Sequence, residues 1–391
     1  MKIVSIVGAR PQFIKAAVVS RSLRAKPGIS EVLIHTGQHY DDNMSEVFFR
    51  ELDIPRPDYN LFVGSASHGV QTGRMLEGIE RVLLVEAPDW VVVYGDTNST
   101  VAGAMAACKL QIPTAHVEAG MRSFCCQPEE INRVWTDHAS TQLFAPTEAA
   151  VANLGREGIG APKVHLVGDV MYDAWLYYAE RAALRSHMLD RLGVVAKAYL
   201  LVTLHRAENT DCRAHLRALT DALREIAAEF PVIFPLHPRT RKSLANAGLL
   251  DRLSSSAQLI EPVGYLDLMA LESNARLIAT DSGGVQREAF FARVPCVTLR
   301  DETEWVELAQ AGWIQLVSPA RGGAAIASAL REMLSSVPLP LDLPFSDGHT
   351  ADRIRDAIWS ATPADRLPTG TCDSAASALA GVSGQAFPDK H

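Results

Sequence analysis

The chain has 391 residues, so two domains of about 150 to 200 residues each are the default expectation. A hydrophobic fraction of 48% and a charged fraction of 21% exclude a disordered or fibrous protein. The formal net charge of −8 argues against a protein that binds nucleic acid through a broad basic surface, so any anionic ligand must be held by a local group of residues.

No stretch of the chain approaches the ~20 consecutive apolar residues that a membrane helix requires. The N-terminal segment MKIVSIVGARPQFIK contains only a short apolar run that ends in glycine. The sequence therefore predicts a cytoplasmic protein with neither a membrane segment nor a nucleic-acid partner.

Apolar runs alternate with helical patterns along the whole chain. In chain order the runs are KIVSIVG, EVLIHTG, WVVVYGD and QLFAPT, followed by YLLVTLH, PVIFPLH, RLIATDS and PCVTLR. Near-continuous apolar strands separated by helices are typical of parallel sheets that are covered on both faces. Between the second and third runs, Met75, Ile79, Val82 and Leu83 repeat at helical spacing and predict a crossover helix.

These patterns predict an α/β protein with two Rossmann-like domains that face each other across a cleft. We place the first domain at residues 1–170 and the second at residues 171–362. Residues 363–391 are rich in Ala, Gly, Ser and Pro with weak periodicity, which predicts a tail that is dispensable for the chemistry. Because ligands of doubly wound sheets bind beyond the carboxyl ends of the strands, the polar residues that follow each strand are the candidate site residues.

The first run ends in GARPQFIK, which puts Arg10 in the loop and Lys15 in the next helix. A glycine-led turn offers backbone N–H groups and the positive end of the helix dipole, and two cations beside it would complete an anion site. The segment matches neither GxGxxG nor the P-loop pattern. A plain turn with a solvated arginine is therefore the alternative interpretation.

Three carboxylates of the first half follow strands or lie in loops: Asp96 in YGDTNST, Glu118 in HVEAG and Glu129 in QPEEINR. A carboxyl group at the end of an apolar strand is partly desolvated, which raises its pKa towards the range useful for proton transfer. Three such groups at one edge of a sheet indicate acid/base chemistry. For Asp96 alone, the alternative is a role in capping the helix that begins near Thr100.

The stretch HVEAGMRSFCCQPEE also contains the adjacent residues Cys125 and Cys126. The six cysteines of the chain show no CxxC spacing, and no HxH or HExxH pattern accompanies them, so we expect neither a metal site nor a disulfide framework. Adjacent cysteines are also poorly placed to bridge each other. We interpret the pair as ordinary reduced thiols, which leaves the carboxylates as the candidates for chemistry.

Two strands of the second half end in histidine: His205 follows YLLVTL and precedes Arg206, and His237 follows PVIFPL and precedes three basic residues, Arg239, Arg241 and Lys242. Histidines beside cations at strand ends favour an anionic ligand. A structural histidine held by hydrogen bonds is the alternative for each.

The segment LIATDSGGVQREAF carries the clearest binding pattern of the second half. Its strand ends at Asp281, Ser282 can cap the next helix, and Gly283 and Gly284 allow a ligand to approach the backbone. Free N–H groups at such a helix start favour a diphosphate, while Glu288 suits the paired hydroxyls of a ribose. The combination predicts a nucleotide-diphosphate site, with an ordinary N-capped helix as the alternative.

Eight motifs occur in the order and with the spacing of a known family: GARPQFIKAA, HTGQHYDDNM, YGDTNST, HVEAGMRS, PEEINR, LHRAEN, EPVGYLDL and DSGGVQREA. Together they resemble the non-hydrolysing UDP-N-acetylglucosamine 2-epimerase family, and the similarity runs to about residue 360. The first loop lacks the form GTRADY that hydrolysing relatives carry. The resemblance implies a glycosyltransferase-B-like fold, a UDP-sugar substrate, a homodimer and a reaction that needs no cofactor.

The resemblance also implies roles for individual residues. The UDP part of the substrate would be held by Arg10, His205, Leu268, Ser282, Gly283, Gly284 and Glu288. The acid/base groups would be Asp96, Glu118 and Glu129, with Lys15 and His205 beside them. In many bacterial members a second UDP-N-acetylglucosamine activates the enzyme, and the matching positions here are Gln38, Gln71, Arg206 and His237.

The implied reaction inverts C2 of UDP-N-acetylglucosamine to give UDP-N-acetylmannosamine, by anti elimination of UDP to a 2-acetamidoglucal and re-addition. The segments GARPQ, LHPRT and RDETEWVE, the last with Trp305 in place of an arginine, resemble the branch that includes UDP-2,3-diacetamido-2,3-dideoxyglucuronate 2-epimerases. That uronate is therefore an alternative substrate. A glycosyltransferase and a catalytically inactive nucleotide-sugar sensor are further alternatives.

Overall fold

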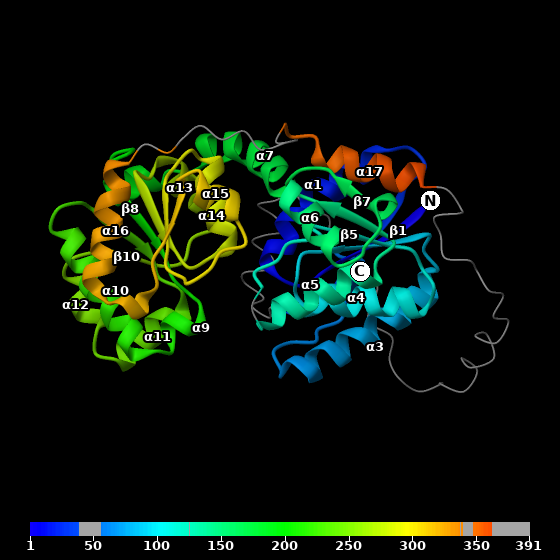
Figure 1. The fold of residues 1–391 in the computed structure, drawn as a ribbon, viewed down its shortest axis with the longest axis horizontal. Helices are drawn as coiled ribbons and strands as arrows, with labels where there is room; N and C mark the ends of the chain where they lie inside the picture. The colour runs from blue at the N-terminus through cyan, green and yellow to red at the C-terminus, as the bar shows by residue number, and fades with distance from the viewer. Residues whose placement is uncertain (39–55, 125, 337, 339–346, 362–391) are drawn as a thin grey trace. The chain divides into compact units, whose positions relative to one another are not determined.

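The computed structural model describes residues 1–38, 56–124, 126–336, 338 and 347–361. These residues form two compact units, each built around its own sheet (Figure 1). Unit 1 comprises Met1–Ala174 and the segment from Leu343 onward, of which 347–361 are described, and unit 2 comprises Trp175–Asp342. None of the helices in the described ranges is long and apolar enough to cross a bilayer.

Unit 1 contains a seven-stranded, fully parallel sheet in the order β3-β2-β1-β4-β5-β6-β7. Its strands are β1 Lys2–Val7, β2 Ser30–His35, β3 Tyr59–Asn60, β4 Trp90–Tyr94, β5 Thr114–Val117, β6 Gln142–Ala145 and β7 Val164–Leu166. The strand order reverses between β1 and β4, which is the position where doubly wound sheets bind their ligands.

Helices cover both faces of this sheet, which is why central strands such as β4 are buried throughout. The described residues of unit 1 form the α-helices α1 Arg10–Ala25, α3 His68–Glu86, α4 Asn98–Lys109, α5 Pro128–Ala139, α6 Glu148–Arg156 and α17 Thr350–Ser360, while α7 Val170–Arg185 contains the boundary to unit 2. The predicted crossover helix is confirmed as α3, and Met75, Ile79, Val82 and Leu83 form its buried face.

Unit 2 repeats the same strand order in a six-stranded parallel sheet, β10-β9-β8-β11-β12-β13, with its reversal between β8 and β11. The strands are β8 Leu200–Thr203, β9 Val232–Pro235, β10 Gln258–Ile260, β11 Leu277–Thr280, β12 Cys296–Thr298 and β13 Ile314–Leu316. The two sheets confirm the predicted α/β class with two Rossmann-like domains.

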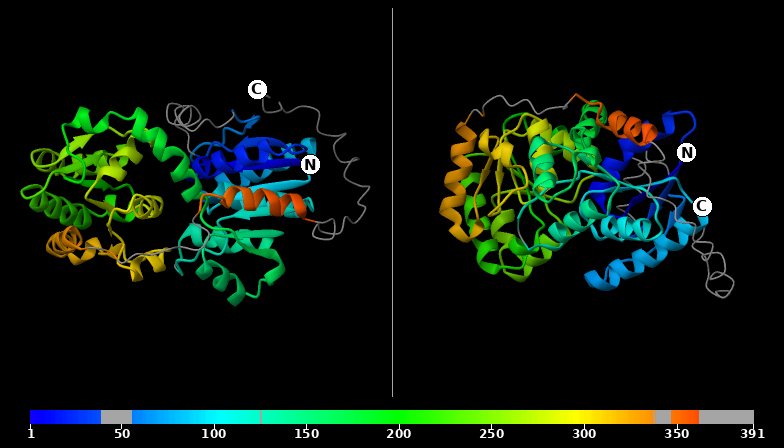
Figure 2. Two further views of the ribbon diagram at one scale, coloured as in Figure 1. Left: turned by 90° about the horizontal axis from the view of Figure 1, so that it is seen from above. Right: turned by 45° about the vertical axis from the view of Figure 1, so that its right-hand side comes forward.

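The main core of unit 2 lies under two packed helices, α10 and α16, which Figure 2 shows side by side. The helices of this unit are α8 Met188–Leu192, α9 Ala207–Thr210, α10 Arg213–Ala227, α11 Pro238–Asn246, α12 Leu250–Ser254, α13 Tyr265–Asn274, α14 Gly283–Phe291, α15 Val306–Gln310 and α16 Gly323–Ser335. Leu216, Leu219, Leu223 and Ile226 repeat at helical spacing on α10 and fill this core.

The last described helix, α17, belongs to unit 1 rather than to unit 2. It packs against α1, where the Ser22 hydroxyl donates to Asp352 at 2.7 Å, and the backbone N–H of Ala351 donates to Asp173 at 2.8 Å. The expected second domain, residues 171–362, includes this helix, whereas the observed division of the chain assigns it to unit 1. The expected tail, 363–391, lies outside the described residues.

Candidate active site

The carboxyl edge of the unit 1 sheet brings together two of the predicted site residues. Lys15 projects from α1, and its ammonium group forms an ion pair with Glu118, which directly follows β5. Both side chains are nearly buried, with exposed fractions of 5% and 11%. A cation and a carboxylate from different elements therefore meet beyond the strand ends, at the reversal of the strand order.

Gly95 lies directly against this pair. Its φ of +63° is left-handed, and a Cβ atom there would lie 3.0 Å from Lys15 Nζ and 3.3 Å from Glu118 Oε2. Any larger residue would therefore push into the ion pair. Because Gly95 directly precedes Asp96, the backbone that leads into Asp96 also lies beside Lys15 and Glu118.

Glu118 itself has a left-handed backbone, with a φ of +72°. Such a conformation costs a non-glycine residue about 1–3 kcal/mol and persists only where the surroundings impose it. Here the backbone N–H groups of Glu118 and Ala119 both donate to the carbonyl of Phe144, at 3.0 and 3.1 Å. The strain aims the carboxylate at Lys15 and is typical of a functional position.

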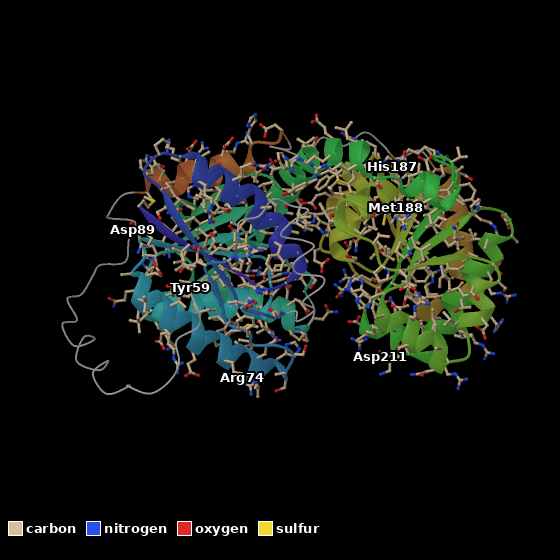
Figure 3. The ribbon with its side chains drawn as sticks, turned by 180° about the vertical axis from the view of Figure 1, so that it is seen from behind. Tyr59, Arg74, Asp89, His187, Met188 and Asp211 are labelled. Carbon is tan, nitrogen blue, oxygen red and sulfur yellow. The ribbon has the colours of Figure 1, made fainter. Side chains whose placement is uncertain are left out.

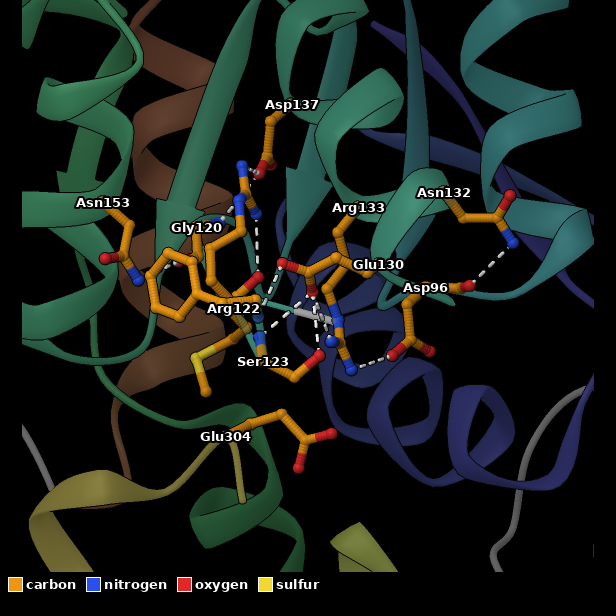
Figure 4. A network of polar contacts seen from close by, with 12 residues as sticks. Asp96, Gly120, Arg122, Ser123, Glu130, Asn132, Arg133, Asp137, Asn153 and Glu304 are labelled. Atoms are coloured by element: carbon orange, nitrogen blue, oxygen red, sulfur yellow. Dashed lines mark hydrogen bonds and ion pairs between the residues drawn. The ribbon is translucent and has the colours of Figure 1, made fainter. Parts of the chain in front are cut away.

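Asp96 is held by α5 on its other side. Its Oδ2 atom lies 2.5 Å from a guanidinium nitrogen of Arg133, and its carbonyl accepts a hydrogen bond of 3.0 Å from Asn132 (Figure 4). The helix cap of α4 is Thr97, paired with Thr100. The alternative interpretation of Asp96 as the cap is therefore wrong.

The two adjacent glutamates of α5 have different environments. Glu130 is buried, accepts hydrogen bonds from the backbone N–H groups of Ser123 and Phe124, and pairs with Arg133 at 3.0 Å (Figure 4). Glu129 is exposed on the first turn, and no contact with Asp96 or Glu118 is seen in the described part of the chain. The acid/base role expected for Glu129 therefore stays a prediction.

Glu130 was not predicted from the sequence, although a signal exists. Glu130 and Asp137 are seven residues apart, which is two helical turns, and both are buried on α5. The periodicity of the helix could therefore have identified Glu130 as the inward-facing member of the pair.

Both strand-end carboxylates are paired with cations, Glu118 with Lys15 and Asp96 with Arg133. The prediction from the sequence included only their partial desolvation, whereas each carboxylate contacts a cation carried by a helix.

The first loop differs from the expected open anion site. The backbone N–H groups of Gly8 and Ala9 donate to Oε1 of Gln12, at 2.8 and 3.0 Å, and the Gln12 amide donates to the carbonyl of Tyr94 at 2.9 Å. These N–H groups are therefore satisfied by the chain itself. The side chain of Arg10 lies outside the described part of the structure, and its predicted role stays a prediction.

In unit 2, the loop after β8 is fixed by Asp281, the residue that follows β11. Its buried carboxylate accepts hydrogen bonds from the backbone N–H groups of His205 and Arg206 and from the side chain of Asn209, at 3.0 to 3.2 Å. His205 Nδ1 also lies 3.3 Å from Asp281. Burial acts to raise the pKa of Asp281, but these donors outweigh it and hold the pKa below its usual value.

The orientation of His205 follows from this contact. Because Nδ1 faces Asp281, the opposite ring nitrogen, Nε2, is the one that a ligand could contact. The side chain of His205 is 45% exposed, so a ligand can reach it.

The start of α14 has the features expected of a diphosphate site. Ser282 is the cap, and its hydroxyl accepts from the backbone N–H of Val285. A Cβ atom on Gly283 or Gly284 would meet no other atom closer than 3.7 or 3.8 Å, and neither glycine has a left-handed φ. The chain's own packing therefore does not require glycine here, whereas a ligand close to the backbone would.

Two further predicted residues lie on neighbouring helices of unit 2. Glu288 is buried on α14, and Leu268 is half-buried on α13. Both are thus within the same unit as the capped helix start, and their proposed contacts with UDP stay predictions.

The predicted regulatory residues fall into two pairs, one in each unit. In unit 1, Gln38 accepts from the Ser99 hydroxyl at 2.7 Å, and Gln71 accepts from the Asn98 side chain at 2.8 Å, so both glutamines hold the start of α4. In unit 2, Arg206 and His237 are the residues that precede α9 and α11. Regulation by a second UDP-sugar stays a prediction.

The basic residues after β9 contribute less free positive charge than the sequence indicates. Arg239 forms an ion pair of 2.7 Å with Asp211, which is labelled in Figure 3. Arg241 forms an ion pair of 2.6 Å with Glu261. The histidine pair remains close, since the ring centroids of His205 and His237 are 6.0 Å apart. The candidate phosphate donors of this unit are therefore His205 and the start of α14.

Among the described residues, no group of three or more His, Cys, Asp or Glu side chains could hold a metal ion. Cys108, Cys126, Cys212 and Cys296 are free thiols, and Cys125 lies outside the described residues.

A sequence model of the UDP-N-acetylglucosamine 2-epimerase family matches residues 21–359. The chain belongs to this family. The glycosyltransferase-B-like fold expected from the motifs is the fold of the family's solved structures.

Relatives in this 2-epimerase family share about half of their residues with the chain. A UDP-N-acetylglucosamine 2-epimerase homolog of Methanococcus maripaludis is 55% identical, over 81% of this chain and 88% of its own length. The UDP-2,3-diacetamido-2,3-dideoxy-D-glucuronate 2-epimerase of Pseudomonas aeruginosa is 52% identical, over 82% and 89%. The crystal structure of the Methanocaldococcus jannaschii UDP-GlcNAc 2-epimerase in complex with UDP-GlcNAc and UDP superposes with a TM-score of 0.85 at 46% identity, over 92% of this chain and 100% of that one.

Proposed function

We propose that the chain is a non-hydrolysing epimerase that inverts C2 of UDP-N-acetylglucosamine to give UDP-N-acetylmannosamine. The observation that carries this proposal is the pair of carboxylates at neighbouring strand ends of unit 1, Asp96 and Glu118, each held against a cation. Family membership supplies the substrate class, and the M. jannaschii enzyme of known structure binds UDP-GlcNAc.

The C2 hydrogen of the sugar is not acidic by itself, because C2 is not next to a carbonyl group. If the bond from C1 to the UDP oxygen breaks first, C1 acquires cationic character and the C2 proton can be removed. The products of this elimination are 2-acetamidoglucal and UDP. Re-addition of UDP at C1 and of a proton to the opposite face of C2 completes the inversion, and no cofactor is consumed.

Unit 2 is the part that we propose holds UDP. Negative charge develops on the leaving diphosphate, and we expect His205 Nε2 and the N–H groups of Gly283 and Gly284 to stabilise it, with Arg10 as a further donor. Loss of one such donor typically lowers the rate by about 10²–10³-fold. Glu288 and Leu268 would hold the nucleoside.

Unit 1 is the part that we propose transfers the proton. Removal and return on opposite faces require at least two acid/base groups. Glu118, paired with Lys15, suits the proton acceptor, and Asp96 and Glu129 are the candidates for the second group.

UDP-2,3-diacetamido-2,3-dideoxyglucuronate is a second candidate substrate. The P. aeruginosa enzyme named for that sugar is 52% identical to this chain. Trp305 is buried here, and the guanidinium of Arg287 lies 4.5 Å from the centre of its ring. The same elimination at C1 and C2 applies to this uronate, because the two sugars differ at C3 and C6.

The test is incubation of the purified protein with each UDP-sugar alone, followed by NMR of the sugar C2 and C1 signals. We expect the C2 epimer of at least one substrate without any acceptor. A glycosyltransferase would give no epimer under these conditions, and a nucleotide-sugar sensor would bind the ligand without turnover. Sedimentation of the same sample tests the proposed homodimer, and cell fractionation tests the proposed cytoplasmic location.

A further inference from the structure

A fully buried histidine lies behind the candidate acid/base residues. His116 is on β5, two residues before Glu118, and its side chain is 0% exposed. Its Nδ1 atom lies 2.7 Å from Asp137 Oδ1, and its Nε2 atom lies 2.8 Å from the carbonyl oxygen of Gly95. Both ring nitrogens therefore have hydrogen-bond partners inside the protein.

The partners define the protonation of the ring. A carbonyl oxygen can only accept, so Nε2 must carry a proton. Asp137 is surrounded by donors, because its Oδ2 atom also accepts from Arg122 at 2.7 Å and from the backbone N–H of Gly120 at 3.1 Å. Burial acts to raise the pKa of Asp137, but His116 and Arg122 outweigh it and hold the pKa below its usual value.

An ionised Asp137 also can only accept, so Nδ1 of His116 carries a proton as well. The ring is then an imidazolium. A neutral imidazole could satisfy only one of these two acceptors, and the other would be left buried without a donor. Other charged groups near this cluster include Glu157, which pairs with Arg122 at 2.7 Å and lies 3.4 Å from His138, and the Lys15–Glu118 pair on the far side of Gly95.

The cluster ties together the two loops that carry the acid/base candidates. Through Gly95 it holds the end of β4, directly before Asp96. Through Asp137, which accepts from the Gly120 N–H, it holds the loop directly after Glu118 (Figure 4). Gly95 is also the residue whose Cα faces the Lys15–Glu118 pair. A shift of the Gly95 carbonyl would therefore move Asp96 relative to Glu118.

We infer that His116, held as an imidazolium between Asp137 and the Gly95 carbonyl, is a positioning residue that sets the geometry of Asp96 and Glu118 for proton transfer. This inference rests on the proposed epimerase function. His116 does not need to touch the substrate, because it acts through the backbone at Gly95.

Two substitutions separate positioning from a general structural role. In His116→Gln the amide nitrogen reaches the Nε2 position and can still donate to Gly95, whereas in His116→Asn the amide reaches only the Nδ1 position and leaves the Gly95 carbonyl unbonded. Since a 1 Å misplacement can cost about 10²-fold in rate, we expect kcat of the Asn variant to fall by about 10²-fold and kcat of the Gln variant to stay within about tenfold of wild type. KM and UDP affinity should change little in both.

The protonation state is tested separately by side-chain ¹⁵N NMR of the histidines, with the signal of His116 assigned by its loss in His116→Gln. We expect protons on both ring nitrogens at neutral pH. A ring nitrogen without a proton would overturn the imidazolium.

The remaining outcomes distinguish this inference from the proposed function. If wild-type protein epimerises a UDP-sugar but the Asn variant keeps the wild-type kcat, the inference fails and the function stands. Equal losses in the Asn and Gln variants, in proportion to their loss of folded protein, would also overturn positioning. If wild-type protein epimerises neither UDP-sugar, the proposed function itself fails.

Discussion

At the scale of single residues, the candidate site depends on contacts so close that an added side-chain atom would collide with a neighbouring group. Gly95 is the clearest case, because it combines a left-handed backbone with close approach to Lys15 and Glu118. The sequence indicates a carboxylate after β4, but it does not show that the preceding glycine touches the ion pair of another strand end.

We predict that Gly95→Ala lowers the free energy of unfolding by about 1–2 kcal/mol through backbone strain, and also lowers kcat by displacing the Lys15–Glu118 pair. Gly158→Ala is the matched control, since Gly158 has a φ of +78° and no atom within 4 Å of the added Cβ. Chemical denaturation and steady-state kinetics of both variants measure the two effects. Equal kcat values in the two variants would show that the contact with the ion pair has no catalytic consequence.

A second prediction at this scale concerns Asp137 and acid. Its folded-state pKa lies below the usual value of 3.8, so its stabilising contribution is present above that value and is lost as the pH falls towards the folded-state pKa. Asp137→Asn should therefore destabilise the protein by about 3–5 kcal/mol at neutral pH, and the difference from wild type should shrink below about pH 4.

The measurement is urea unfolding of wild type and Asp137→Asn at a series of pH values. Asp221→Asn is the control, because Asp221 forms an exposed ion pair with Arg252 at 3.2 Å that contributes little. A difference between wild type and Asp137→Asn that stays constant into acid would contradict the assignment of an ionised Asp137.

At the scale of elements, the start of α14 carries the binding of UDP in the proposed function. Since no atom of the described residues lies closer than 3.7 Å to a Cβ added at position 283, we predict that Gly283→Ala folds with unchanged stability but binds UDP at least tenfold more weakly, which is about 1.4 kcal/mol. Gly155→Ala, on α6 and also with no atom within 4 Å of the added Cβ, is the control. Titration calorimetry with UDP measures the affinities, and an unchanged affinity in Gly283→Ala would remove the diphosphate from this helix start.

The elements that the sequence predicts correctly are the central strands. Eight apolar runs correspond to β1, β2, β4, β6, β8, β9, β11 and β12, because strands covered on both faces need continuous apolar residues. Among the strands outside these eight runs, β3, β7, β10 and β13 have only two or three residues and lie at the sheet edges with partial exposure. Such segments carry too short a pattern to be recognised.

In the candidate site too, residues whose position follows from the local sequence could be predicted, whereas contacts between distant parts of the chain could not. Strand-end residues such as Asp96, Glu118 and Ser282 could be predicted, because parallel strands place their ends at one edge. Gln12 could not be ranked without knowing which face of its helix is buried, whereas the seven-residue spacing of Glu130 and Asp137 is a sequence signal for Glu130. The partners Lys15 and Arg133 are far from their carboxylates in sequence, so the ion pairs depend on packing between elements.

At the scale of the whole molecule, the proposed chemistry divides between the two units, with proton transfer in unit 1 and UDP in unit 2. The C-terminal helix α17 joins unit 1 through buried residues such as Ile354 and Ile358, although 168 residues of unit 2 stand before it in the chain. Sequence order alone could not show this return, because α17 has an amphipathic pattern that suits either sheet.

The central claim is that epimerisation proceeds by elimination of UDP and removal of the C2 proton. The most direct measurement is turnover of the UDP-sugar by the purified protein in deuterated water, with NMR detection of C2 in the product. The elimination mechanism predicts deuterium from the solvent at C2 of the product epimer, because the proton is returned from an exchangeable carboxyl group. Epimer that forms with the original hydrogen retained at C2 would contradict it.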